Sequence, residues 1–232
     1  MNIDSTNIEG LDFPVFYRPN TTDVETANFI FTRSPLVLKR SIFSPKKIDD
    51  FEPKFIIDGG AHAGYSSLFF AYTYPNARIA AVEPESENFK LLQMNIEHYP
   101  KISPLNLALW SHETYLEIVN PDKETDSFMT QETSDYKDRV LTQSVSIEQI
   151  FKASRFEFID ILKLNVNGAE REIFSDDSHY QSWLPYTKIL IIELHDRMKR
   201  DCSHNFFHAI SWYEYFFMQA ENNLIFIRED LL

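Results

Sequence analysis

The sequence predicts an α/β fold in which helices cover both faces of a mostly parallel sheet. From Lys54 onward, short apolar segments typical of strands alternate with segments of helical periodicity. The most apolar strand segment, residues 188–194, suits the middle of a parallel sheet, which is buried on both faces. The first strand segment leads into three closely spaced glycines, in a chain of 232 residues that has only five. Ligands of such folds bind where the strands end, so this turn is the first candidate for a binding site.

Strand and helix segments follow one another along the chain in the order expected for this fold. Apolar and β-branched runs indicate strands, whereas apolar residues three or four positions apart indicate helices. The predicted strands cover residues 54–58, 78–84, 102–110, 114–119, 142–147, 158–166 and 188–194, and the predicted helices cover residues 64–74, 85–98, a segment from 168, and 205–211. Residues 213–219 and 223–229 flank a turn sequence and predict a terminal hairpin, while the polar stretch 120–137 predicts a mobile loop.

We expect two parts in the chain, an N-terminal cap formed by residues 1–50 and a main domain formed by residues 51–232. The first part shows no regular alternation of strand and helix and has one short helical stretch at residues 24–31. The second part contains the whole predicted sheet and has a suitable length for one α/β domain.

The composition argues against several classes of partner. A net charge of −13 gives the surface a negative potential that repels phosphates and anionic lipids, so we expect neither nucleic acid nor a membrane as a partner. Cys202 is the single cysteine, which rules out an internal disulfide and a cysteine zinc site. The first residues lack the pattern of a signal peptide, and we expect the protein in the cytoplasm.

An aromatic stretch near the C-terminus, residues 205–217, admits two interpretations. Packing in the core and in the terminal hairpin is the simpler one. The alternative is an exposed surface that joins two copies of the chain in a homodimer or contacts a substrate.

The glycine cluster consists of Gly59, Gly60 and Gly64, where the chain turns from strand to helix. Glycine allows a sharp turn and lets a ligand approach the main chain, because no β-carbon stands in the way. The amides at the start of the next helix suit a polar or anionic group. A tight turn alone would also account for the glycines, so a second signal is needed.

The second signal is Glu83, which ends the next predicted strand. In doubly wound folds, an acid at this point accepts hydrogen bonds from the ribose hydroxyls of a nucleotide cofactor. The glycine turn and Glu83 together predict a cofactor that contains adenosine.

The glycine spacing discriminates between two such cofactors. A dinucleotide fingerprint requires G-x-G-x-x-G, but Ala61 takes the place of the middle glycine, where a pyrophosphate needs the closest approach. The pattern D-x-G-x-x-x-G fits without a mismatch at Asp58, Gly60 and Gly64. It resembles motif I of class I methyltransferases, which bind S-adenosylmethionine (SAM). An NAD-dependent oxidoreductase is the alternative.

Several segments resemble, in the same order, the motifs of FkbM-type methyltransferases. IIDGGAHAGYSS is similar to the family's VIDVGANIGYFS, and IDILKLNVNGAEREIF is similar to iDliKiDvEGaElevL. Similarity extends from about residue 16 to residue 228 and includes the segments FYRPNTTDVETANFIF, VEPESENFKLLQMNI, LNLALWSHETYLEI, SVSIEQI and IIELHD.

The resemblance implies a Rossmann-like sheet of seven strands with an antiparallel strand in the C-terminal hairpin. It also implies a SAM-dependent enzyme that methylates a hydroxyl oxygen of a small molecule or glycan. Glu83 would hold the ribose and the region of Ala108 would lie beside the adenine. The residues placed around the methionine end of the cofactor are Asp58, Gly60, Ala61, Gly64 and Tyr65.

Two positions depart from the family pattern. Asn165 and Asn167 stand where the family usually has aspartate and glutamate, in a segment that would face cofactor and acceptor. An amide cannot act as a base at neutral pH, so a SAM-binding protein with impaired catalysis is a further alternative. If catalysis depends on those carboxylates, restoring them should raise turnover.

Methylation of a hydroxyl also needs a group that accepts the proton. His195, at the end of a predicted strand beside Asp196, is the first candidate, Glu170 is the second, and Asn165 faces the same site. Glu193 and His195 share one strand face, but the sequence offers no further convincing ligand beside them, so we expect no metal.

Overall fold

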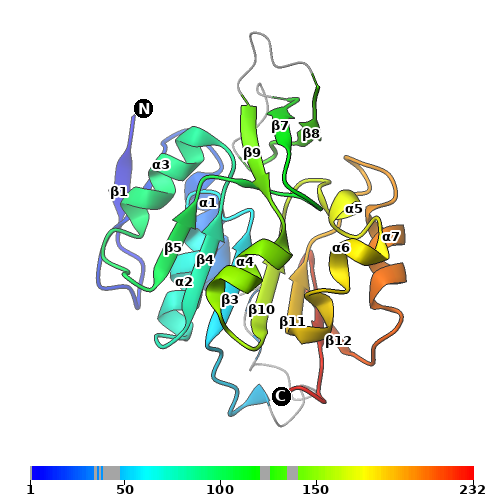
Figure 1. Cartoon of the computed structure of the whole chain (residues 1–232). Coiled ribbons are helices and arrows are strands. Elements are labelled where there is room, and N and C mark those ends of the chain that lie inside the picture. Colours follow the sequence, from blue (N-terminus) through cyan, green and yellow to red (C-terminus); the bar gives the residue numbers. More distant parts are fainter. Residues whose placement is uncertain (1, 34–35, 37, 39–47, 121–125, 135–140) are drawn as a thin grey trace.

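The protein is described by a computed structural model that covers residues 2–33, 36, 38, 48–120, 126–134 and 141–232. A seven-stranded sheet lies between two groups of helices (Figure 1). Its strand order is β12-β13-β11-β10-β3-β4-β5. In chain order, the strands are β3 (Phe55–Gly59), β4 (Arg78–Val82), β5 (Ile102–Leu105), β10 (Ile159–Leu164), β11 (Thr187–Ile192), β12 (Phe216–Ala220) and β13 (Asn223–Ile227).

The pairing of these strands confirms the predicted fold class. Neighbouring strands from β5 to β11 pair in parallel, whereas β13 is antiparallel to both β11 and β12. All five residues of β3 and all six of β10 are buried, as expected for central strands covered on both faces. The sheet is therefore Rossmann-like, with an antiparallel strand in the C-terminal hairpin.

Each face of the sheet packs against its own helices. Side chains such as Ile56 and Ile161 face the first group, and side chains such as Ile57 and Leu162 face the second. The first group contains α1 (Asp23–Asn28), the π-helix η1 (Phe29–Arg33), α2 (Tyr65–Thr73) and α3 (Ser86–Asn95). The second contains α4 (Ile147–Ser154), α5 (Glu170–Ile173), α6 (Asp177–Tyr180), the 3-10 helix η3 (Leu184–Tyr186) and α7 (Cys202–Ile210).

A smaller sheet stands beyond the carboxyl ends of the main strands (Figure 1). Its order is β6-β9-β7-β8, with β6 (Ala108–Leu109), β7 (Tyr115–Ile118), β8 (Thr130–Glu132) and β9 (Leu141–Val145). The prediction of a loop over residues 120–137 was wrong for β8, because this short polar strand pairs with β7 instead of presenting an apolar pattern of its own. Residues 121–125 and 135–137 lie outside the described residues.

The N-terminal residues pack on the main sheet's first helix group. β1 (Asp4–Thr6) and β2 (Val15–Tyr17) form an antiparallel pair. The Asn95 side chain, at the end of α3, accepts a hydrogen bond from the Phe16 amide at 2.7 Å. It also donates to the carbonyls of Phe16 and Ala63, at 3.0 and 2.8 Å. One asparagine thus joins the N-terminal strand pair to the glycine turn.

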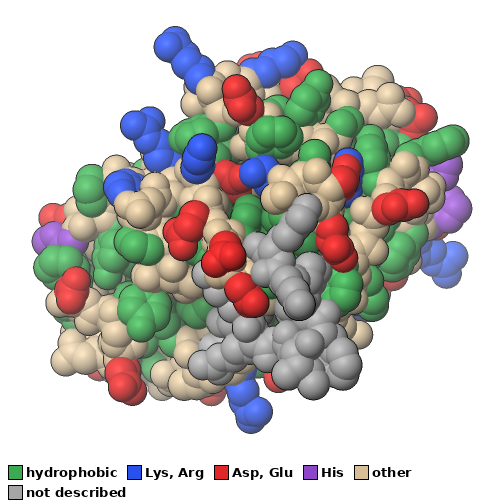
Figure 2. All heavy atoms as spheres, turned by 90° about the horizontal axis from the view of Figure 1, so that it is seen from below, with side chains coloured by type: hydrophobic (Ala, Val, Ile, Leu, Met, Phe, Trp, Pro, Cys, Tyr) green, Lys and Arg blue, Asp and Glu red, His purple; other side chains and the backbone are tan. Residues whose placement is uncertain are grey.

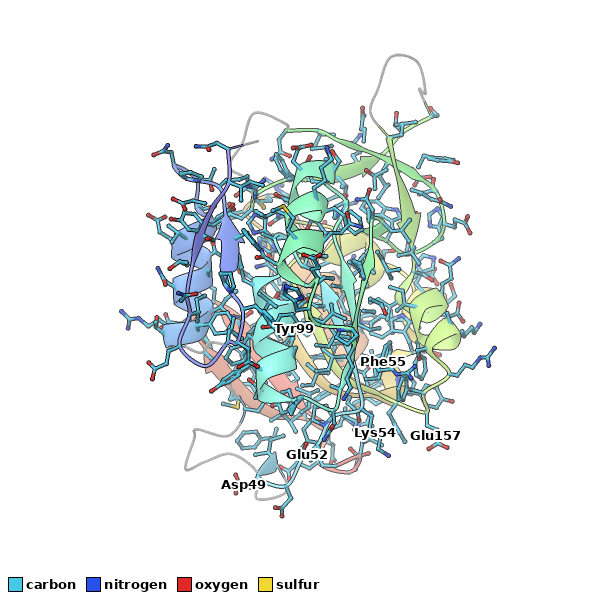
Figure 3. The ribbon with its side chains drawn as sticks, turned by 90° about the vertical axis from the view of Figure 1, so that its left-hand side faces the viewer. Asp49, Glu52, Lys54, Phe55, Tyr99 and Glu157 are labelled. Atoms are coloured by element: carbon cyan, nitrogen blue, oxygen red, sulfur yellow. The ribbon has the colours of Figure 1, made fainter. Side chains whose placement is uncertain are left out.

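The strands begin at the lower end of the molecule, where Figure 3 labels Lys54 and Phe55. The Asp160 carboxylate accepts hydrogen bonds from both of their amides there. Figure 2 views this end and shows acidic and basic side chains interspersed over its described part. The carboxyl ends of the parallel strands, and with them the candidate site, therefore lie at the opposite end.

Two surface properties bear on the predicted partners. In the aromatic stretch, Phe206 is buried in the core, whereas Trp212 and Phe217 are exposed, so a homodimer stays a prediction. Among the described residues, no helix combines the length and the apolar character needed to cross a bilayer.

Candidate functional site

A cavity of about 340 Å³ opens at the carboxyl edge of the main sheet. Residues that follow β3, β4, β10 and β11 form its floor, and residues of α1 and η1 close one side. The small sheet contributes Ala108 and Leu109, and the segment before β8 contributes Asp126, Ser127 and Phe128. The cavity therefore lies where the fold is expected to bind ligands.

The glycine turn forms part of the cavity wall. Gly60 has a φ of 71°, in the left-handed region, and its amide donates to the Val82 carbonyl at 3.0 Å. A β-carbon at Gly60 would lie 1.8 Å from the carbonyl oxygen of Asn165. Only glycine fits this position, because the turn passes directly against the segment that follows β10.

A buried ion pair supports the turn from beneath. Asp58 is fully buried and accepts hydrogen bonds from the hydroxyls of Ser66 and Ser67, both at 2.6 Å. Lys163 Nζ lies 3.0 Å from the Asp58 carboxylate and donates to the Gly60 carbonyl at 2.8 Å. Sequence reasoning missed Lys163, although a lysine inside an apolar strand is a usable signal, because a buried lysine needs a partner.

Glu83 presents a buried carboxylate to the cavity. It is 5% exposed and accepts hydrogen bonds from the His62 amide at 2.9 Å and the Glu85 amide at 3.0 Å. The Asn88 side chain donates a third hydrogen bond at 3.2 Å. Burial raises the pKa of Glu83 to about 7, although these three donors act in the opposite direction.

The structure separates the predicted cofactor residues into two groups. Asp58 lies beneath the turn, and Gly64 caps the start of α2, where an added β-carbon would face Leu92 of α3. Neither residue lines the cavity. The predicted residues that do line the cavity are Gly60, Ala61, Tyr65, Glu83 and Ala108.

His195 and Glu170 form a buried pair, with His195 in the segment after β11 and Glu170 as the first residue of α5. In the sheet, β10 and β3 separate β11 from β4, which precedes Glu83. The His195 Nδ1 atom lies 2.7 Å from the Glu170 carboxylate, and the side chains are 3% and 0% exposed. Glu170 also accepts hydrogen bonds from the amides of Gly168 and Val166, at 2.7 and 3.3 Å. A carboxylate only accepts, so Nδ1 donates this hydrogen bond, and in a neutral imidazole the lone pair is then on Nε2. His195 lines the cavity, whereas Glu170 lies behind it.

Asn165 acts as a hydrogen-bond donor at this site. Its amide nitrogen donates to the Glu193 carboxylate at 3.0 Å, and the other Glu193 oxygen lies 3.8 Å from His195 Nε2. The second distance is too long for a direct hydrogen bond, so Nε2 is available to a ligand. In the described part of the chain, no group of three His, Cys, Asp or Glu side chains could hold a metal ion.

The N-terminal residues also reach the site, through Arg18, which sequence reasoning did not single out. Arg18 Nε lies 2.7 Å from the Asp23 carboxylate, and Arg18 Nη2 lies 3.1 Å from His62 Nε2 in the glycine turn. Burial lowers the pKa of His62 to about 4, so its ring is neutral at physiological pH. Thr26 and Phe29 continue this part of the wall.

Comparison with known proteins agrees with this geometry. Residues 58–220 match the family model described as "Methyltransferase FkbM domain". No curated protein matches the chain.

Several solved structures are similar to the chain at low sequence identity. A putative O-methyltransferase from Klebsiella pneumoniae has 9% identity and a TM-score of 0.46 over 91% of this chain and 83% of that one. A precorrin-6y C5,15-methyltransferase from Geobacter metallireducens GS-15 has 10% identity and a TM-score of 0.44 over 91% and 89%. TrmK of M. capricolum, in complex with S-adenosyl-homocysteine (SAH), has 11% identity and a TM-score of 0.40 over 79% and 66%.

Proposed function

Because the chain belongs to the FkbM methyltransferase family and its cofactor is SAM, we propose that it methylates a hydroxyl oxygen of a small molecule or glycan. Membership in this family establishes SAM as the cofactor and methyl transfer as the general reaction. The alternative of an NAD-dependent oxidoreductase is therefore set aside. The oxygen acceptor is our inference. It depends on one observation, which is that His195, held by Glu170, opens onto the same cavity as Glu83.

The residues around Glu83 suit the adenosyl part of the cofactor. A buried carboxylate that lines a cavity is a suitable acceptor for two ribose hydroxyls. Val82, Ala108 and Leu109 give the neighbouring wall an apolar character that suits an adenine ring. Gly60 and Ala61 would then lie beside the amino-acid end, as the family resemblance implies.

His195 is the proposed proton acceptor. When bound, SAM supplies an electrophilic methyl group on its sulfonium. The His195 Nε2 lone pair would take the hydroxyl proton of the acceptor as the new oxygen–methyl bond forms, and Glu170 would stabilise the imidazolium that results. Enclosure of the cavity by the N-terminal residues would hold both reactants in line and exclude water.

With an amide at position 165, the site still contains a carboxylate and the proposed base. Glu193, which Asn165 holds by a hydrogen bond, keeps a carboxylate in the cavity, 3.8 Å from His195 Nε2. These contacts favour an active enzyme over a SAM-binding protein with impaired catalysis.

Two measurements in sequence test the proposed function. Calorimetry with SAH measures cofactor binding, and transfer of a labelled methyl group from SAM to a panel of hydroxylated small molecules and glycans measures activity. We expect binding and then labelling of an acceptor oxygen. Binding with labelling confined to nitrogen or carbon acceptors would contradict the oxygen assignment. Stabilisation by NAD and not by SAH would contradict the cofactor site.

We predict that Glu83→Ala weakens SAH binding by about 1–3 kcal/mol, because two ribose hydroxyls would lose their buried acceptor. Isothermal calorimetry measures the change. Glu87→Ala is a matched control, since Glu87 is a nearby glutamate, in the first turn of α3, whose side chain is 46% exposed. Equal affinity of the Glu83 variant and the native protein would remove Glu83 as the ribose anchor.

We also predict that SAH affinity rises with pH through about 7, the pKa of Glu83 in the free protein. Ribose hydroxyls donate more strongly to the ionised carboxylate, so binding favours the charged form and releases a proton below this pH. A single linked proton changes affinity by at most about tenfold per pH unit. Titrations between pH 6 and 8 measure the slope, and Glu83→Gln should abolish it. A flat profile in the native protein would mean that Glu83 does not face the ligand.

A further inference from the structure

Asn167 joins two parts of the cavity wall that are far apart in the sequence. Its amide nitrogen donates to the carbonyl of Asp126 at 2.9 Å and to the carbonyl of Phe128 at 3.2 Å. Both hydrogens of the amide are thus used to hold the main chain of the segment that precedes β8. This contact has no role in the chemistry proposed above.

The held segment, residues 126–130, forms part of the cavity wall. Asn120 binds it from the other side, donating to the Ser127 carbonyl at 2.8 Å and accepting from the Met129 amide at 2.6 Å. Four of its residues line the cavity, namely Asp126, Ser127, Phe128 and Thr130. Two asparagine amides therefore fix the backbone of this wall segment, one from its own hairpin and one from the main sheet.

The wall segment shares the cavity with both parts of the candidate site. Asp126 lines the same cavity as His62 of the glycine turn and as His195. Its carbonyl is bound by Asn167, which follows β10 and lines the cavity as well. A change in the position of the segment would therefore alter the space available to a ligand.

An asparagine is well suited to this position. Asn167 has a φ of 53°, in the left-handed region that asparagine tolerates better than most residues. Its side chain donates to carbonyls, whereas a carboxylate can only accept. The glutamate that the family resemblance places here could not make either of the two hydrogen bonds.

We propose that Asn167 is a positioning residue that fixes residues 126–130 as a wall of the cavity, and that this wall encloses the ligand bound there. The hydrogen-bonded attachment is independent of the proposed function, while its effect on ligands rests on it. Asparagine in place of the family's glutamate thus supplies the two N–H groups that hold the wall segment. A carboxylate at this position should weaken that attachment.

Hydrogen exchange of the ligand-free protein tests the attachment directly. Asn167→Asp keeps the size of the side chain and removes both donors, and we expect the amides of residues 126–132 to exchange roughly tenfold faster or more. Amides of β10 and β11 in the same sample report whether the rest of the sheet is unchanged. Unaltered exchange in residues 126–132 would overturn the proposal.

Two further variants separate the attachment from general effects of the substitution. Asn205→Asp is the matched control, because the Asn205 amide also donates to a backbone carbonyl, that of Arg171, but away from the cavity. It should leave residues 126–132 unchanged. Should Asn167→Asp fail to fold, Asn167→Gly keeps the left-handed backbone without strain, and the same acceleration is expected.

The dissociation rate of SAH tests the effect on the cavity. Release of the wall in Asn167→Asp should accelerate SAH dissociation several-fold, measured by stopped-flow displacement, whereas Asn205→Asp should not change it. Faster exchange without faster dissociation would overturn the role of the wall in enclosing the ligand. A protein that binds no SAH at all would refute the cofactor site, while the exchange result would still decide the attachment.

Discussion

Replacing His195 by glutamine is expected to lower kcat for methyl transfer by about 10²–10⁴-fold while leaving SAH affinity within about twofold. Glutamine can still donate to Glu170 and fills a similar volume, but it offers no lone pair that can take a proton at neutral pH. The structure leads to this separation of effects because His195 follows β11, and β10 and β3 separate that strand from β4, which precedes Glu83. Steady-state kinetics with an acceptor from the panel gives kcat, and calorimetry gives the affinity.

Two companion variants sharpen this prediction. Glu170→Gln should lower kcat by a smaller factor, because the imidazole remains but loses the charge that stabilises its protonated form. His208→Gln, on an exposed position of α7, should change neither parameter. Full activity of the His195 variant would show that another group accepts the proton.

Gly60→Ala is expected to destabilise the protein by about 2–5 kcal/mol and to abolish measurable SAH binding. The added methyl group would lie 1.8 Å from the Asn165 carbonyl oxygen, and the backbone φ of 71° is itself unfavourable for alanine. Relief of the contact requires the turn to move away from the end of β10, which displaces the part of the wall that would face the cofactor. Denaturant unfolding and calorimetry measure the two effects.

Gly64→Ala measures how much the strained backbone alone lowers the stability of the protein, without the close contact found at Gly60. Gly64 also has a left-handed φ, of 89°, but the nearest atom to an added methyl group is a side-chain carbon of Leu92 at 3.3 Å. We therefore expect a smaller loss of about 1–2 kcal/mol from the strained backbone, with SAH binding retained. Equal losses in the two glycine variants would mean that the close contact with Asn165 is relieved at little cost.

Much of the fold could be predicted from the sequence because its strands are short, apolar and separated by clear helical segments. The segments 54–58 and 188–194 became β3 and β11 within one or two residues, and the terminal hairpin became β12 and β13. Strand β8 could not be predicted, since its residues, Thr130–Glu132, are polar and its structure comes from pairing with β7.

The site was less predictable, because the role of a side chain depends on which partners the fold brings to it. Asp58 fits the cofactor pattern by spacing, yet its carboxylate faces Lys163, which is 105 positions away in the sequence. His195 and Glu170 were separate candidates for one role and form a single pair in the structure. The attachment of His62 to Arg18 could not be inferred, since nothing in either segment indicates the other.

The close approach of Gly60 to the main chain at Asn165 has a consequence for how the two ligands affect each other's binding. Gly60 belongs to the turn that would bind the cofactor, and Asn165 follows the strand whose end would face the acceptor. No side chain lies between the two backbones, so nothing there can adjust if one of them moves. A shift of either loop must therefore be transmitted to the other. The two ligands should then influence each other's affinity by equal factors, as thermodynamic linkage requires.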